Sequence, residues 1–220
     1  MLSPIPVEDA PILDPIDRNA EILFGVFMCL TFTGTLSAAT AGTEEIRTMM
    51  IAAISCNAAW GFVDGVMYIL RNLVAGGRRL LLVRAVRAAP DPSHARAIIA
   101  ADLGPLYVRA MGEEGLERVR AEACALTDIP SRPALTWHTV RAALMVFALV
   151  FLSTFPLVLP FLFFDTVQRA MRISAVIAIA ILFICGYSWG KYAGLRPWRV
   201  GLLMVVTGVI VELAVIALGG

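Results

Sequence analysis

Five long apolar stretches alternate with polar segments along the chain. They cover residues 22–39, 48–73, 140–164, 173–190 and 200–218. Each is close to the roughly 20 residues that an α-helix needs to cross a hydrocarbon core about 30 Å thick. The pattern therefore predicts an all-α membrane protein with five transmembrane helices.

The remaining sequence divides the chain into segments around these spans. We expect an acidic, proline-rich tail, the first two spans, a small helical insert and the last three spans, at residues 1–20, 21–75, 76–139 and 140–220. Within the insert, Pro90-Asp91-Pro92 and Gly112 interrupt the helical pattern. Ser93 is a candidate N-cap for the helix that begins there.

Proline and glycine mark where the apolar helices bend and pack. Pro156 and Pro160 lie in the third stretch, and each removes a backbone donor, which predicts a kink. Gly186, Gly190 and Gly194 recur every four residues at the end of the fourth stretch. Such a glycine stripe predicts a face where another helix approaches closely.

The arginines predict the orientation of the chain in the membrane. They are abundant in residues 76–139, and Lys191, Arg196 and Arg199 lie between the fourth and fifth spans. Basic residues favour the cytoplasmic side, so the N-terminus and the insert are expected in the cytoplasm and the C-terminus outside. Lys191 is the only lysine, and this arginine bias points to a bacterial inner membrane.

Composition supports the membrane assignment and excludes other classes. Hydrophobic residues make up 59% and charged residues 16% of the chain, against about 45–50% and about 25% in soluble domains. A net charge of +1 gives no basic field for nucleic acid. No catalytic triad or metal-knuckle spacing is readable, so we expect neither an enzyme nor a disulfide framework from the cysteines, which are Cys29, Cys56, Cys124 and Cys185.

Two acidic residues lie inside apolar stretches, Asp64 in the second and Glu212 in the fifth. A carboxylate in hydrocarbon is costly unless it faces a cavity, a partner or a protein interior, so each is a candidate functional residue. Glu212 is either a proton carrier or a second ion site, or a buried carboxyl kept protonated near the outer surface. Helical rise puts Asp64 about 10 Å and Glu212 about 20 Å from the cytoplasmic edge, so the two are expected to be separate stations.

Polar residues and methionines accompany Asp64 along one helix face. Asn57, Gly61, Asp64, Tyr68 and Arg71 recur at helical spacing, and Met67 lies one turn from Asp64. On the first span, Glu21 and Met28 share a face. A carboxylate beside thioethers suits a borderline or soft divalent metal. The alternatives are an Asp64–Arg71 pair and methionines that only pack the core.

The insert carries a group of glutamates on one predicted helix, Glu113, Glu114, Glu117 and Glu122. Glu113 and Glu117 are four residues apart, so they repel unless something neutralises them. A metal cation is one candidate. The other is arginine, because Glu114 and Arg118 are four apart and Glu117 and Arg120 are three apart.

The C-terminal third resembles the vacuolar iron transporter (VIT) family. The segment FPLVLPFLFF resembles the family's proline pair, and ISAVIAIAILFICGYSWGKYAGLRPWRVGLLMVVTGVIVELAVIAL resembles its last two helices with their glycine-rich junction. The resemblance implies a homodimer that moves Fe²⁺, and often Mn²⁺, out of the cytosol in exchange for protons. It also implies that insert glutamates gather the metal, a role that falls here to Glu113, Glu114, Glu117 and Glu122.

The buried acids together with this resemblance lead us to expect a proton-coupled exporter of Fe²⁺, or of Mn²⁺, with Asp64 as central ligand and no permanently bound cofactor. Its partners would be the lipid bilayer, the ion and a second copy of the chain. An alternative is a non-transporting scaffold whose insert binds a partner or lipid. This is favoured by Met28, which lies where the family's first helix usually carries an Asn-Asp pair. A third possibility is a proton-coupled carrier of another solute.

Overall fold

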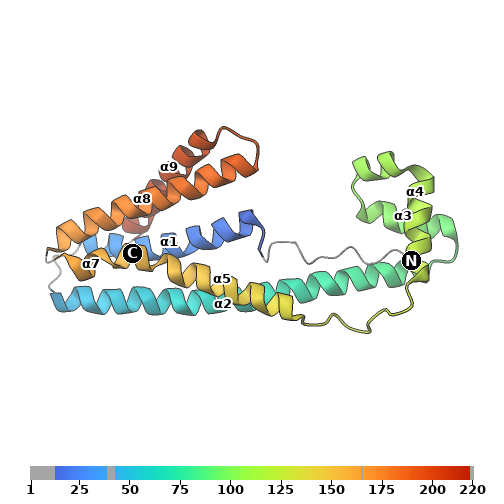
Figure 1. The fold of residues 1–220 in the computed structure, drawn as a ribbon, viewed down its shortest axis with the longest axis horizontal. Helices are drawn as coiled ribbons and strands as arrows, with labels where there is room; N and C mark the ends of the chain where they lie inside the picture. Colours follow the sequence, from blue (N-terminus) through green and yellow to red (C-terminus); the bar gives the residue numbers. More distant parts are fainter. Residues whose placement is uncertain (1–12, 39–42, 165, 219–220) are drawn as a thin grey trace. The chain divides into compact units, whose positions relative to one another are not determined.

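The computed structural model describes residues 13–38, 43–164 and 166–218, with side chains at 32–38, 43–46, 49, 215 and 216 left undescribed. The residues that it describes form helices and connecting segments (Figure 1). The helices are α1 (Pro15–Ala38), α2 (Thr43–Arg87), α3 (Pro92–Asp102), α4 (Pro105–Ala125), α5 (Trp137–Ser153), α6 (Phe155–Val158), α7 (Pro160–Phe163), α8 (Val167–Tyr192) and α9 (Pro197–Ala217). The prediction of an all-α fold is confirmed.

Four helical segments within the described residues are long and apolar enough to cross a membrane. They are Met50–Arg87, Trp137–Phe163, Val167–Tyr192 and Pro197–Ala214. They coincide with the last four predicted spans, which makes the chain a multi-pass membrane protein. The predicted first span coincides with α1, whose side chains are described only as far as Thr31, and it is not among the four.

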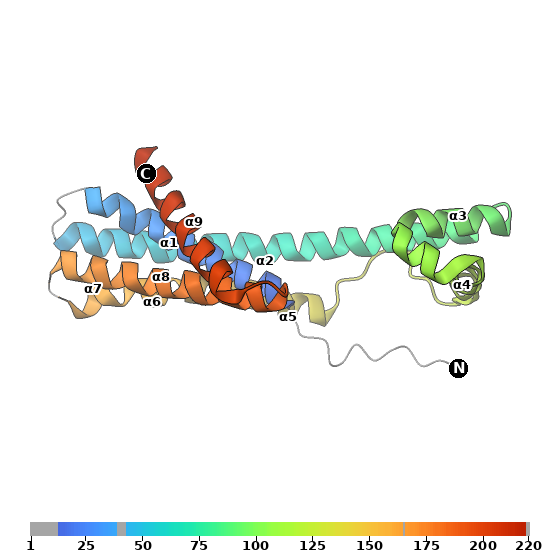
Figure 2. The same ribbon diagram turned by 90° about the horizontal axis from the view of Figure 1, so that it is seen from above.

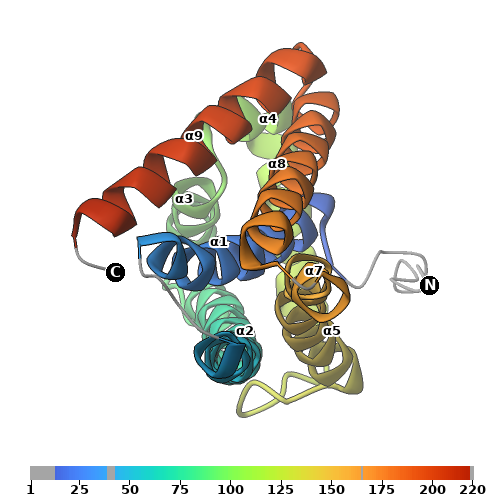
Figure 3. The same ribbon diagram turned by 90° about the vertical axis from the view of Figure 1, so that its left-hand side faces the viewer.

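The chain forms two compact units, one of residues 1–68 and 140–220 and the other of residues 69–139. We call the first the bundle and the second the insert unit. In the bundle, α1 lies between the α8–α9 pair and the helices α2 and α5 (Figure 3). Its main apolar core joins α1, α6 and α8 through fully or almost fully buried side chains, which include Leu23, Val26, Leu157 and Leu182.

Helix α1 begins at Pro15, seven residues before the predicted first span, because Asp14 caps it. The Asp14 carboxylate accepts a hydrogen bond from the Ile16 amide at 2.8 Å, and Pro15 occupies the first helical position, where no donor is needed. The end of α8 bonds to this start: Trp189 Nε1 donates to the Ile16 carbonyl at 3.3 Å, and Tyr192 donates to Asp14 at 3.2 Å. Residues 1–12 of the predicted tail lie outside the described residues.

Helices α8 and α9 are joined by a short turn and pack together near it, and α9 diverges from α8 farther from the turn (Figure 2). A Cβ on Gly186 would lie 2.8 Å from the Val200 carbonyl oxygen, and one on Gly190 would lie 2.7 Å from the Pro197 Cα. Close helix approach at these two glycines is therefore confirmed. Gly194 does not belong to this stripe: its φ is +67° and it lies in the turn after α8.

The turn at Gly194 is a Schellman motif that ends α8. The Gly194 amide donates to the Lys191 carbonyl at 3.3 Å, and the Leu195 amide donates to the Gly190 carbonyl at 2.9 Å. This motif requires a left-handed backbone conformation at Gly194, and glycine adopts it without a Cβ penalty. The four-residue spacing predicted that Gly194 packs against another helix. That prediction is wrong because the spacing does not show that α8 ends before Gly194.

In the insert unit, α3 and α4 pack on the last turns of α2. The small core is formed by Val86, Ala95, Ile99 and Leu116. Gly112 has φ +60° and bends α4, as its position in the sequence predicted. Two arginines of α2 bond the segment that follows α4. Arg84 donates to the Pro130 and Ser131 carbonyls, and Arg87 donates to the Leu126 carbonyl, at 2.8–3.1 Å.

The N-cap of α3 is Asp91, and the prediction of Ser93 is wrong. Asp91 Oδ1 accepts a hydrogen bond from the His94 amide at 2.8 Å, and Ser93 donates its hydroxyl to the same carboxylate. Pro92 therefore takes the first helical position. These hydrogen bonds from Ser93 and His94 lower the pKa of the exposed Asp91 carboxyl below its ordinary value.

Candidate functional site

The face of α2 that carries Asn57 packs against α5. A Cβ on Gly61 would lie 3.0 Å from the Phe147 carbonyl oxygen, and one on Gly65 would lie 3.0 Å from the Ala143 carbonyl oxygen. The space beside Gly61 is thus taken by the neighbouring helix α5. Asp64 immediately precedes Gly65 in the chain and is half-buried.

Asn57 is fully buried and connects three helices of the bundle. Its side-chain amide donates to the Gly25 carbonyl of α1 at 3.0 Å and to the hydroxyl of Thr154, which lies between α5 and α6. Its Oδ1 atom is buried and has no hydrogen-bond partner among the described residues. An unsatisfied acceptor of this kind costs about 1–3 kcal/mol. The Oδ1 atom is therefore available to accept a hydrogen bond or to bind a cation.

The third span is broken where Asn57 meets it. The Pro156 and Pro160 rings lack the N–H groups that would bond the preceding turns, and the span divides into α5, α6 and α7. The Thr154 amide bonds the Phe151 carbonyl at 3.3 Å in a tighter turn, and the Ser153 hydroxyl donates to the Val150 carbonyl at 2.7 Å. The predicted kink is confirmed, and it places polar atoms inside a membrane-spanning segment.

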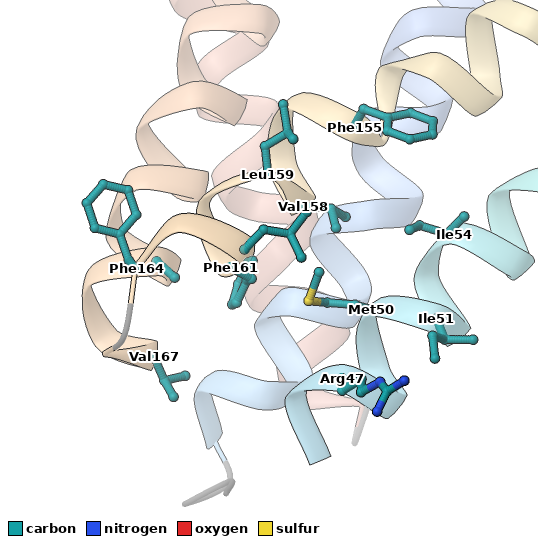
Figure 4. Close-up of a pocket in the computed structure, with 12 residues that line it drawn as sticks. Arg47, Met50, Ile51, Ile54, Phe155, Val158, Leu159, Phe161, Phe164 and Val167 are labelled. Carbon is teal, nitrogen blue, oxygen red and sulfur yellow. The ribbon is translucent and has the colours of Figure 1, made fainter. Parts of the chain in front are cut away.

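A cavity of about 580 Å³ opens beside the broken span (Figure 4). In Figure 4, Arg47, Met50, Ile51 and Ile54 of α2 lie across from the α6–α7 segment, and the Met50 thioether lies among the lining side chains. The remaining lining residues are Phe155, Val158, Leu159, Phe161, Leu162, Phe164, Val167 and Ala170. Arg47 provides the charged group in a lining that is otherwise apolar.

A second cavity, of about 230 Å³, lies between α1, α8 and α9 and contains Glu212. The Glu212 side chain is half-buried, and the other lining residues are Leu30, Met171, Ala175, Ala178, Ile179, Leu182, Gly208, Val209 and Leu213. We call this space the Glu212 cavity. The acid of the last span therefore lines a space that these three helices form together.

The other predicted pathway residues occupy varied environments. Met67 is 47% exposed on α2, whereas Glu21 and Met28 on α1 and Tyr68 on α2 are half-buried. Tyr68 packs against a core cluster that includes Val146 of α5. No group of three His, Cys, Asp or Glu side chains able to hold a metal occurs in the part of the chain that the structure describes. A metal site centred on Asp64 remains a prediction.

Arginines bond two of the predicted metal-gathering glutamates of the insert unit. Glu117 bonds Arg96 of α3 at 2.9 Å and Arg120 at 2.7 Å, which lowers the pKa of its carboxyl to about 2. Glu114 pairs with Arg118 at 3.4 Å on the exposed surface. The two arginine pairs expected from the spacing are therefore confirmed, while capture of metal by these glutamates is untested.

Sequence reasoning missed several residues that the tertiary structure brings to these sites. Thr154 and Gly25 hold Asn57, and Met171 lines the Glu212 cavity. The signal for Thr154 was its place directly before the Pro156 kink in an apolar span. Nothing in the local sequence marks Met171, because an apolar helix carries such side chains by composition alone.

Comparison with known proteins identifies one family. The model of the VIT family matches residues 102–220, which is more than half of the chain. This match confirms the resemblance of the last three spans. No curated protein matches the chain.

Proposed function

The chain belongs to the VIT family, and from this membership we propose that it exports a divalent metal ion from the cytosol, Fe²⁺ before Mn²⁺, in exchange for protons. The VIT family is a family of membrane transporters and not of enzymes, which agrees with the four membrane-spanning segments. The observation that carries the proposal is the pair of acids in two of these segments, Asp64 on α2 and Glu212 on α9. Carboxylates at such depth mark ion or proton pathways.

In this proposal the two acidic residues have different roles. Asp64 is the central ligand, with Asn57, Met67, Tyr68, Met28 and Glu21 as its surroundings on α1 and α2. Glu212 relays protons or forms an outer station. The unsatisfied Oδ1 of Asn57 supports this arrangement, because it offers an oxygen next to the broken span without any competing donor from the described residues.

The topology belongs to the same proposal. The bundle crosses the bacterial inner membrane five times, with α1 as the first span, the N-terminus in the cytoplasm and the C-terminus outside. The insert unit lies in the cytoplasm, where Glu113, Glu114, Glu117 and Glu122 capture the ion. Two copies of the chain form a dimer in the lipid bilayer, and nucleic acid is not a partner.

The test is metal flux in proteoliposomes under a pH gradient. Fe²⁺ and Mn²⁺ uptake would be compared for the wild-type protein, for Asp64→Asn, and for Asp128→Asn as a matched control on the exposed segment after α4. We expect gradient-dependent flux that Asp64→Asn abolishes and Asp128→Asn preserves. Flux at the wild-type rate in Asp64→Asn would remove the central ligand from the proposal.

A second candidate is a non-transporting scaffold whose insert unit binds a partner or anionic lipid. The family match begins at residue 102, so the helix that carries Asp64 lies outside it. The arginine pairs of Glu114 and Glu117 also leave less carboxylate for a metal. Correctly inserted wild-type protein that moves no metal in the same assay would favour this candidate.

A further inference from the structure

The cavity beside the broken third span has a charged end and an apolar body. Figure 4 shows Arg47 and Val167 at one end of it, and Ile54 and Phe155 at the other. Arg47 is the charged residue of the lining, and the other lining side chains are apolar. We call this space the Arg47 cavity. Its walls therefore change from charged to apolar along its length.

The Arg47 cavity opens sideways onto the surface of the bundle. Ile51, Leu159 and Leu162 line it and are still 58%, 42% and 66% exposed. They belong to two of the segments that are long and apolar enough to cross a membrane, Met50–Arg87 and Trp137–Phe163. Since the hydrocarbon core of a bilayer holds no water, the cavity must be filled by a lipid chain or by protein.

The depth of the cavity matches one leaflet of a bilayer. Arg47 precedes the apolar segment Met50–Arg87 by three residues, so it lies where arginines reach lipid head groups. Ile54 follows Arg47 by seven residues, which is about 10 Å along the helix. One leaflet of a hydrocarbon core about 30 Å thick is about 15 Å deep. The cavity is thus charged at head-group depth and apolar at acyl-chain depth.

A phospholipid has a charged and an apolar part in the same order. The cavity volume of about 580 Å³ lies within the range of about 300–1,000 Å³ that ligand pockets occupy. A guanidinium group binds phosphate through paired, charge-assisted hydrogen bonds. No ion pair reaches Arg47 from the described residues, so its guanidinium is available to a phosphate.

A second copy of the chain fits this cavity less well. A two-fold interface centred on it would bring Arg47 close to the same residue of the other copy, and like charges repel. Glu44 and Glu45 precede Arg47 in the sequence. The recognised group is therefore the phosphate next to Arg47, and a net negative charge on the whole head group is not required.

We propose that the Arg47 cavity binds one membrane phospholipid. The phosphate pairs with Arg47, and one acyl chain fills the apolar space between α2 and the α6–α7 segment. The break at Pro156 and Pro160 provides this space, because it divides the third span beside α2. The site does not depend on metal transport, and none of its lining residues belongs to the proposed ion pathway.

The phosphate contact is tested by native mass spectrometry of the full-length, delipidated protein. Dioleoyl phosphatidylglycerol would be compared with dioleoylglycerol, which has the same chains and no phosphate. One basic residue beside a lipid phosphate contributes about fivefold in affinity. Arg47→Gln should therefore weaken phosphatidylglycerol binding about fivefold and leave dioleoylglycerol binding unchanged. Arg141→Gln, at an exposed arginine of α5, is the control. Unchanged phosphatidylglycerol affinity in Arg47→Gln would overturn the proposal.

The acyl-chain contact is tested by filling the cavity. Ile51→Trp should weaken binding of both lipids about tenfold, which corresponds to the loss of roughly two buried methylene groups. Ile210→Trp on α9 is the matched control, because Ile210 is 60% exposed and lies outside the cavity. The same spectra report the number of chains. If Ile51→Trp separated two copies and left lipid affinity unchanged, a second copy would cover the cavity and the proposal would fail.

A measurement on the wild-type protein covers the case in which the variants do not fold. Phosphatidylglycerol with a photoreactive diazirine in its acyl chain would be placed in nanodiscs with the protein and illuminated. We expect labelled peptides from residues 50–54 and 155–164. Label on other surfaces alone would contradict the site. The flux assay is independent: metal flux without this label removes the lipid site, whereas the label without flux removes the proposed transport.

Discussion

The Asn57 side chain on α2 donates a hydrogen bond of 3.0 Å to the backbone carbonyl of Gly25 on α1. The same amide reaches Thr154 at the break of the third span. One buried side chain therefore fixes three spans against one another where the helix is interrupted. It does so with a neutral group, which is cheaper to bury in hydrocarbon than a charge.

Asn57→Ala is expected to destabilise the bundle by about 1–3 kcal/mol, because it removes both bonds and leaves the Thr154 hydroxyl without its donor. Thermal unfolding of the detergent-solubilised protein measures the loss. Gln168→Ala, at an exposed position of α8, is the control and should stay within about 0.5 kcal/mol of wild type. Equal stability of the two variants would show that the three-helix connection is not stabilising.

Gly25→Ala is expected to disturb the same region by crowding. A Cβ at this position would lie 2.5 Å from the Val150 carbonyl oxygen and would also meet the Ser153 hydroxyl. The carbonyl is backbone and cannot rotate away, so we expect a loss of about 1–3 kcal/mol or more.

The matched control is Gly104→Ala, because no atom lies within 4 Å of a Cβ built there. Both variants would be compared by thermal unfolding and by retention in size-exclusion chromatography. If Gly25→Ala behaved like Gly104→Ala, α1 and α5 would have to be farther apart than the structure shows.

Lowering the pH is expected to destabilise the insert unit, because it protonates Glu117. Its arginine partners lower the pKa of this carboxyl from the ordinary 4.5 to about 2. A lowered folded-state pKa adds stability that is complete above the unfolded value and is lost as the pH falls from 4.5 towards 2. Glu117→Gln should remove this part of the pH dependence.

Hydrogen exchange of α3 and α4, corrected for the intrinsic rate, checks this at pH about 6 and about 3. Protection of the wild-type helices should fall with acid more steeply than in Glu117→Gln. Glu122→Gln, on the same helix and without an ion pair among the described residues, should behave like wild type. A wild-type protein as insensitive to acid as Glu117→Gln would refute the role of the pair.

Much of the secondary structure was predictable because it depends on local composition. The last four spans follow from apolar length, the breaks at Pro156 and Gly112 follow from backbone chemistry, and the Glu117–Arg120 pair follows from helical spacing. The errors lie at helix ends. Ser93 and Asp91 are both good N-cap residues, and only the folded backbone shows which one faces the free amide of His94.

The candidate sites were predictable only in part. Asp64 and Glu212 are recognisable as candidate residues without a structure, because a carboxylate inside an apolar membrane span is costly to bury. The sequence does not show that Gly61 and Gly65 pack against α5, or that Met171 and Glu212 line one cavity. Those neighbours are distant in the chain and are set by the packing of whole helices.

The sequence by itself determined that this protein is an all-α membrane protein of the VIT family with acids inside two spans, since hydrophobic length and motif order are properties of the chain. The tertiary structure decided which groups meet: Asn57 with Gly25 and Thr154, and Glu212 with the cavity of α1, α8 and α9. Helices in a bilayer are uniformly apolar outside, so their pairing depends on close contact of small residues and a few polar groups. That contact exists only after the helices have packed.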